Sequence, residues 1–219
     1  METMKKQLFI FDLDGTLIDA YQAIWKALLY ARSALGYPPV DFETAKRAVG
    51  YGDKNYILKF FRQDDVEQAR TIYLEYHLKI LNNNISLMPG ARDILEKLKQ
   101  NKRVIAVASN RPSRAGLCIL ENLGIKDFFS KTIFGDQVKQ QKPDSEMISK
   151  IIEELGINPR FAVFIGDMTI DVATGRNAGV DTIAIPTGSS TLDELRESNP
   201  ARLCNSLFDV IDLINSGVL

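Results

Sequence analysis

The stretch QLFIFDLDGT, residues 7–16, sets the frame for the rest of the chain. Its apolar run ends at Asp12, which predicts a short buried strand followed by a polar turn. Side chains two apart in an extended chain project to one side, so Asp12 and Asp14 face the same space. Gly15 then permits a tight turn. Two carboxylates placed this way suit a nucleophile and a general acid/base, with capping of the turn as the alternative.

Three more apolar runs, at residues 103–108, 161–165 and 181–185, have the same strand-like character. Helical patterns, in which apolar residues return every third or fourth position, occupy residues 90–100, 114–123 and 146–155. Strands that alternate with helices favour βαβ units. The sequence therefore predicts an α/β fold built on a Rossmann-like parallel sheet.

Residues 19–87 differ from the rest of the chain because they contain only helical patterns. These patterns cover residues 21–35, 42–49, 56–61 and 67–81, without a strand candidate between them. We therefore expect an α/β core of residues 1–18 and 88–219, with an all-helical cap of residues 19–87 inserted after the first strand. Trp25 stands at helical spacing with other apolar residues and is expected to pack inside the cap.

Three other polar motifs follow predicted strands or precede a helix. Ser109 and Asn110 offer a hydroxyl and an amide that suit phosphate oxygens, although the same pair also caps helices. Lys142, before Pro143, supplies a point charge that would neutralise an anion. Asp167 ends a strand and Asp171 follows four residues later, an arrangement that favours a hard cation such as Mg²⁺.

Three of these motifs stand at the carboxyl ends of strands of one parallel sheet, and Lys142 lies between the second and the third. Ligands in open α/β sheets bind beyond those carboxyl ends. The order of the motifs resembles the haloacid dehalogenase-like superfamily. Its DxDGT, (S/T)N, KP and GDxxxD signatures match residues 12–16, 109–110, 142–143 and 166–171. The helical insertion looks like the C1 cap of that superfamily, and the layout is similar to phosphoglycolate phosphatase-like members.

The resemblance implies a role for each motif residue. Asp12 would form an aspartyl-phosphate, while Asp14 would protonate the leaving oxygen and then activate water. Cations are required, because two unit charges 4 Å apart repel by ~4 kcal/mol at an effective dielectric constant of 20. By the same resemblance, Mg²⁺ would be held by Asp12, Asp167 and the Asp14 main-chain carbonyl, and the phosphate by Ser109, Asn110 and Lys142. Thr16, Gly166 and Asp171 would support these groups. Tyr51 and Lys54 in the cap loop 50–54 would contact the leaving group.

The expected activity is Mg²⁺-dependent hydrolysis of a small phosphomonoester, phosphoglycolate-like or a sugar phosphate. Two alternatives stay open: a phosphosugar mutase of the β-phosphoglucomutase type and a non-enzymatic regulatory module. Asp14 argues against the dehalogenase branch, which lacks an acid/base there. Met168 stands where a small polar residue is common, and Arg111 replaces a common lysine, which loosens the substrate assignment.

The composition of the chain limits the classes of binding partner that we expect. With 27 basic and 28 acidic residues the net charge is −1, so neither nucleic acid nor an anionic membrane is expected to bind. Two distant cysteines and a single histidine argue against zinc, and His77 is expected to be exposed or at the rim of the core. Without a signal-peptide or membrane pattern, we expect a cytoplasmic monomer or homodimer acting on a phosphorylated metabolite.

Overall fold

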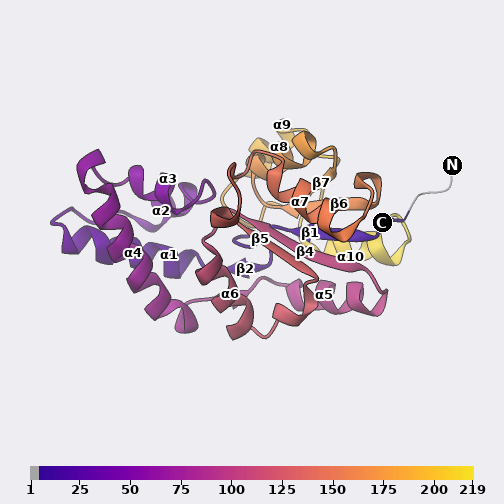
Figure 1. Cartoon of the computed structure of the whole chain (residues 1–219), viewed down its shortest axis with the longest axis horizontal. Coiled ribbons are helices and arrows are strands. Elements are labelled where there is room, and N and C mark those ends of the chain that lie inside the picture. The colour runs from indigo at the N-terminus through magenta and orange to yellow at the C-terminus, as the bar shows by residue number, and fades with distance from the viewer. Residues whose placement is uncertain (1–4) are drawn as a thin grey trace.

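A six-stranded parallel sheet organises the computed structural model, which describes residues 5–219 (Figure 1). The first four residues, part of the predicted core segment 1–18 and of the N-terminal stretch used to predict location, lie outside the described residues. The strands run in the order β5 (Lys131–Phe134), β4 (Val104–Ser109), β1 (Leu8–Phe11), β6 (Ala162–Gly166), β7 (Asp181–Ala184) and β8 (Arg202–Leu203).

The three central strands end nearly in step. Phe11 at the end of β1 pairs with Val107 on β4 and with Ile165 on β6. The register continues one residue further, since the amide of Asp12 donates to the Ile165 carbonyl at 2.9 Å. Polar residues that follow these strands therefore emerge together at one edge of the sheet.

Helices cover both faces of the sheet. Alternate β1 residues such as Phe9 pack towards α5 (Ala91–Gln100), α6 (Ser113–Asn122) and α10 (Leu207–Asn215). The residues between them, such as Ile10, pack against α7 (Glu146–Leu155), beside which α8 (Thr169–Ala178) lies. Leu195 of α9 (Leu192–Glu197) packs against Val172 and Ala184. Burial of both faces explains why the central strands read as continuous apolar runs.

The segment between β1 and α5 forms a helical part beside the sheet (Figure 1). Within it, α1 (Tyr21–Ala34) packs along α4 (Val66–Ile80), and Trp25 donates from its indole nitrogen to the Val40 carbonyl at 2.8 Å. Its apolar residues belong to the same buried cluster as one face of the sheet. Its helices are α1 (Tyr21–Ala34), α2 (Phe42–Arg47), α3 (Asp53–Leu58) and α4 (Val66–Ile80).

Two short strands mark where the chain leaves the sheet and returns. Ile18 of β2 (Ile18–Asp19) pairs antiparallel with Leu87 of β3 (Ser86–Leu87). The expectation that residues 19–87 contain no strand is therefore wrong at both ends, because two-residue pairings are too short to produce periodicity. The 3₁₀ turns are η1 (Gln63–Asp65), η2 (Leu81–Asn83), η3 (Lys126–Phe128), η4 (Gly135–Gln137) and η5 (Pro159–Phe161).

The predicted fold class is confirmed, and each of the four predicted core strands is present. The two edge strands, β5 and β8, were not predicted. β5 begins with two half-buried polar residues, Lys131 and Thr132, and β8 has only two residues, so neither produces a clear apolar run.

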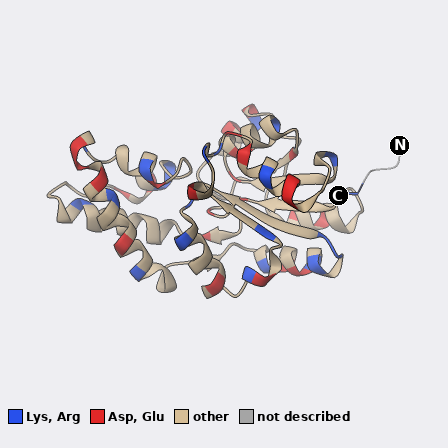
Figure 2. Cartoon of the chain, in the orientation of Figure 1, with Lys and Arg blue, Asp and Glu red and all other residues tan. Residues whose placement is uncertain are grey.

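Charged residues are interspersed rather than segregated. Lys and Arg are mixed with Asp and Glu over both parts of the molecule (Figure 2). Within residues 5–219, no helix combines the length and the apolar character needed to cross a membrane.

Candidate active site

Lys142 lies at the centre of the polar edge of the sheet. Its Nζ atom is 2.6 Å from Asp12 Oδ1 and 2.7 Å from Asp171 Oδ1. The three residues come from the loop before α7, the end of β1 and the first turn of α8, so only the fold brings them together. The side chains of all three are almost completely buried. A buried ammonium between two carboxylates can neutralise an incoming anion beside Asp12.

A cluster of buried acidic side chains occupies the same edge. Ligand oxygens of Asp12, Asp167 and Asp171 lie within 4.8 Å of one another. The Asp167 carboxylate is fixed at both oxygens: Thr16 Oγ1 donates to Oδ1 at 3.0 Å, and the Ser189 amide donates to Oδ2 at 3.0 Å. These bonds hold Asp167 towards the other two carboxylates, as a cation site of oxygen ligands requires.

Gly166 makes room for this arrangement. A Cβ atom at Gly166 would lie 2.4 Å from Asp171 Oδ2, which is closer than real Cβ contacts allow. The glycine at the end of β6 therefore lets the Asp171 side chain fold back over the strand. Asp171 in turn accepts a hydrogen bond from the Met168 amide at 3.0 Å, which orients it at the start of α8.

Charge balance in this edge fits a divalent cation. Burial raises the pKa of Asp12 to about 7 although Lys142 opposes the rise, and burial also raises the pKa of Asp167 well above its usual value. Four carboxylates, of Asp12, Asp14, Asp167 and Asp171, face two cationic side chains, which leaves two negative charges when all are ionised. A hard dication with oxygen ligands such as Mg²⁺ would remove that excess.

The acidic cluster differs in one member from the predicted metal set. Asp12 and Asp167 belong to both, whereas the third carboxylate of the cluster is Asp171, which was predicted only as a supporting residue. Asp14 was predicted to contribute its main-chain carbonyl, and its carboxylate lies outside the cluster. The sequence predicted these residue types, but the folding back of Asp171 depends on its packing against Gly166.

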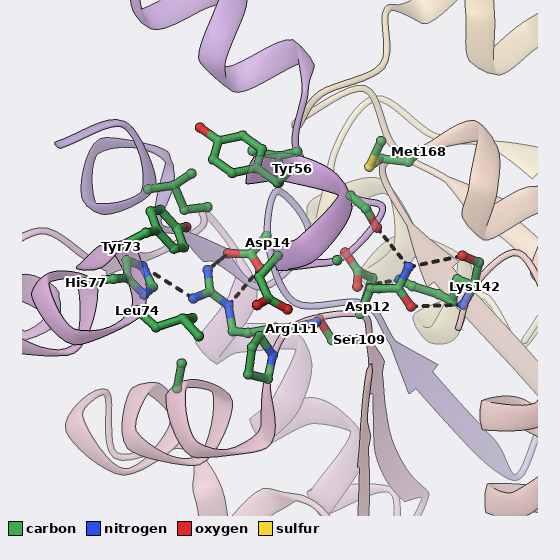
Figure 3. A pocket seen from close by; sticks show the side chains of 18 residues that line it. Asp12, Asp14, Tyr56, Tyr73, Leu74, His77, Ser109, Arg111, Lys142 and Met168 are labelled. Carbon is green, nitrogen blue, oxygen red and sulfur yellow. Dashed lines mark hydrogen bonds and ion pairs between the residues drawn. The ribbon is translucent and has the colours of Figure 1, made fainter. Parts of the chain in front are cut away.

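The Asp14 carboxylate pairs with Arg111. Arg111 Nε donates to Asp14 Oδ2 at 2.9 Å and Nη2 donates to Oδ1, so the guanidinium engages both oxygens. On its other side, Arg111 Nη1 lies 3.5 Å from His77 Nε2, and Figure 3 shows Arg111 between the two. The side chains of the ion pair are 6% and 12% exposed, so this bidentate pair lies inside the molecule.

His77 is buried, contrary to the expectation of an exposed or rim position. Only 1% of the residue is exposed, because α4 turns this side towards the sheet edge. Its ring stacks on Tyr73 with centroids 5.5 Å apart. Burial, and then the Arg111 guanidinium, hold the pKa of His77 well below its usual range. A neutral imidazole that accepts a hydrogen bond from Arg111 follows.

Ser109 and Asn110 have different surroundings. Ser109 is 2% exposed and lines the pocket, as a phosphate-binding hydroxyl would. The side-chain amide of Asn110 is instead engaged by main chain: Nδ2 donates to the carbonyls of Gly50 and Lys142, and Oδ1 accepts from the Lys142 amide at 2.9 Å. Its side chain therefore positions Lys142; Asn110 also lines the pocket, and its phosphate contact stays a prediction.

The pocket lies between the helical part and the polar edge of the sheet (Figure 3). Loop 50–54 reaches it through Gly50, Gly52 and Asp53, whereas Tyr51 and Lys54 do not line it. Lys54 pairs with Glu67 at 3.6 Å on the surface, and Tyr51 is 39% exposed. The helical part contributes a mostly apolar wall, made by Ile24, Val49, Tyr56, Tyr73 and Leu74.

Comparison with known proteins supports the resemblance. The family model of haloacid dehalogenase-like hydrolases matches residues 9–185. The chain belongs to this family. It is 29% identical over 222 residues to a phosphoglycolate phosphatase of Psychrobacter arcticus, covering 96% of both chains, and 28% identical over 215 residues to one of Chromobacterium violaceum, covering 94% of this chain and 96% of that one.

Solved structures agree on the fold of this haloacid dehalogenase-like hydrolase. A crystal structure of a predicted phosphoglycolate phosphatase from Haemophilus somnus superposes with a TM-score of 0.90, covering 96% of this chain and 99% of that one, at 21% sequence identity. The family and these relatives make the chain an enzyme, a hydrolase of the phosphatase type.

Three contributors to the site of this haloacid dehalogenase-like hydrolase were not predicted. Arg111 was noted as a substitution, but its pairing with Asp14 was not expected. His77 and Ser189 had no recognisable motif, because one lies within a helical pattern and the other in a polar loop. The position of Arg111 directly after Asn110 was the one available signal.

Proposed function

We propose that the chain is a Mg²⁺-dependent phosphatase that hydrolyses a small phosphomonoester through an aspartyl-phosphate on Asp12. The observation that carries the proposal is the Lys142 ammonium held between Asp12 and Asp171 beside the acidic cluster. It supports a nucleophilic carboxylate whose repulsion from phosphate is neutralised by neighbouring cations.

The proposed reaction has two displacements at phosphorus. A carboxylate oxygen of Asp12 forms a bond to phosphorus while the bond to the ester oxygen breaks, and Asp14 gives a proton to that oxygen. Water then attacks the phosphorus, Asp14 takes one proton from the water, and the bond between phosphorus and the Asp12 oxygen breaks, which releases inorganic phosphate and restores the carboxylate. Lys142 and Ser109 hold the phosphoryl oxygens in both steps.

The cation would be held by Asp12 and Asp167, with Asp171 in the same cluster and the Asp14 carbonyl as the resemblance implies. Bound Mg²⁺ would supply positive charge to the phosphoryl oxygens. Thr16 and the Ser189 amide keep the Asp167 carboxylate in place for this purpose.

We further propose residues 19–87 as a cap over a core of residues 1–18 and 88–219. The apolar wall from α1, α3 and α4 favours a small leaving group with few hydroxyls, in the manner of phosphoglycolate, over a sugar. A phosphoglucomutase-type reaction and a regulatory module remain the alternatives.

A panel of phosphomonoesters assayed with Mg²⁺ tests the proposal, with inorganic phosphate and sugar isomers measured in the same samples. Phosphate release from at least one small phosphomonoester is the expected result. Isomerised sugar phosphate without free phosphate would favour the mutase. No turnover of any ester, with bound Mg²⁺ verified by calorimetry, would favour the regulatory module.

A further inference from the structure

Arg111 forms an ion pair with Asp14, the residue that the proposed function assigns to proton transfer. The parallel hydrogen bonds from Nε and Nη2 occupy the syn lone pairs of both Asp14 oxygens. A carboxyl group exchanges protons most readily through these lone pairs. While the ion pair is closed, Asp14 has no free syn lone pair to exchange a proton with a leaving oxygen, so the ion pair must open during turnover.

Opening the pair requires another anion. The Arg111 side chain is 6% exposed, and a buried guanidinium left without a partner is strongly unfavourable. Its planar fork already holds a carboxylate, which is the shape that bidentate pairing selects. Among the residues that line the described pocket, the other cation is Lys142, which is engaged by Asp12 and Asp171.

We propose that Arg111 is a latch on Asp14, released when a carboxylate on the leaving group of the substrate takes the place of the Asp14 carboxylate. The inference rests on the proposed function and adds to it how the substrate switches the acid/base on. The exchange replaces one carboxylate by another, so the charge around Arg111 is unchanged and no covalent bond forms or breaks. Arg111 is thus a positioning residue that also determines specificity.

The surroundings of Arg111 suit this exchange. His77 accepts from Nη1, a nitrogen that Asp14 does not use, and therefore holds the guanidinium while its partner changes. The Arg111 amide lies 3.4 Å from Ser109 Oγ, which places the latch next to the proposed phosphate site. A substrate that spans both positions must be short, with its carboxylate a few bonds from the ester oxygen.

Two probes of equal size separate this role from simple binding: 2-phosphoglycolate and its carboxamide, with p-nitrophenyl phosphate as a general phosphatase substrate. In the wild type we expect kcat for the carboxylate to exceed kcat for the amide by about 100-fold or more. Arg111→Lys keeps the charge but reaches one oxygen at a time. In that variant kcat for the amide should rise and the ratio should fall at least about tenfold.

Arg32→Lys is the matched control, because Arg32 is a buried arginine of the helical part that donates to the carbonyls of Pro38 and Phe60. It should leave the ratio unchanged.

A wild-type preference that lies in KM alone, equal kcat on both probes, or an equal loss on both in Arg111→Lys would overturn the latch. The wild-type comparison decides even if the variant does not fold. No phosphate from any of the three probes would instead overturn the proposed function, and the latch with it.

Discussion

The Nζ atom of Lys142 lies 2.6 Å from Asp12 Oδ1, although 130 positions separate the two residues in the chain. The contact forms because β1 is central in the sheet and the loop before α7 returns to its carboxyl end. Asn110 secures the loop by bonding both to the amide and to the carbonyl of Lys142. The proposed nucleophile therefore has a cation beside it before any substrate binds.

Asp12→Asn should reduce phosphate release at least about 100-fold, because a neutral amide cannot form the aspartyl-phosphate. Circular dichroism should match that of the wild type. Asp181→Asn is the control, since Asp181 is exposed and pairs on the surface with Lys6. Activity of Asp12→Asn above about a hundredth of the wild-type level would remove Asp12 from the nucleophile role.

Lys142→Met should lower the free energy of unfolding by about 3–5 kcal/mol in metal-free buffer, because Asp12 and Asp171 would be left buried without their shared cation. Urea unfolding measures the loss. Lys126→Met, which removes a surface pair with Glu121, should cost at most about 1 kcal/mol. Similar losses in the two variants would contradict the stabilising role of the buried pair.

Mg²⁺ should raise the thermal midpoint of unfolding, because an ion bound only by the folded state adds about 2.7 kcal/mol at 100 times its dissociation constant. Asp167→Asn should abolish the shift, since Asp167 belongs to the acidic cluster. Ca²⁺ should bind and inhibit, because a larger ion accepts more oxygens and can take both from Asp12. Full activity after chelation, with metal content checked by elemental analysis, would contradict the metal assignment.

Gly166→Ala should impair both stability and activity. The new Cβ would lie 2.4 Å from Asp171 Oδ2, and such overpacking costs about 1–3 kcal/mol. Urea unfolding and phosphate release measure the two effects. Gly124→Ala is the control: its Cβ would meet nothing within 4 Å, so only the strain of a φ of +60° remains and activity should persist. Equal activity of the two variants would argue against a positioning role for Gly166.

Tyr56→Phe should leave stability unchanged or raise it by about 1 kcal/mol, because the buried Tyr56 hydroxyl has no hydrogen-bond partner among residues 5–219. Tyr56 lines the pocket, so KM for the best panel substrate should change if the hydroxyl serves recognition. Tyr51→Ala should alter KM little, because Tyr51 lies outside the lining. A larger effect at Tyr51 than at Tyr56 would support leaving-group contacts by the cap loop 50–54.

The sequence alone determined the fold class and the residues of the reactive edge. Buried strands are continuous apolar runs, and polar residues that follow parallel strands must meet at one edge, so Asp12, Ser109 and Asp167 were predictable from local pattern. Gly166 was predicted through the resemblance, as part of the GDxxxD signature at the end of β6. These inferences need no knowledge of how distant segments pack.

Tertiary structure alone decided the partners of the side chains. The pairing of Asp14 with Arg111 and the burial of His77 depend on how α4 packs over the sheet edge, and helical periodicity does not specify which edge a helix face meets. The same holds for loop 50–54, whose glycines rather than Tyr51 reach the pocket. Contacts between residues far apart in the chain are set by packing of whole elements, which local sequence pattern does not encode.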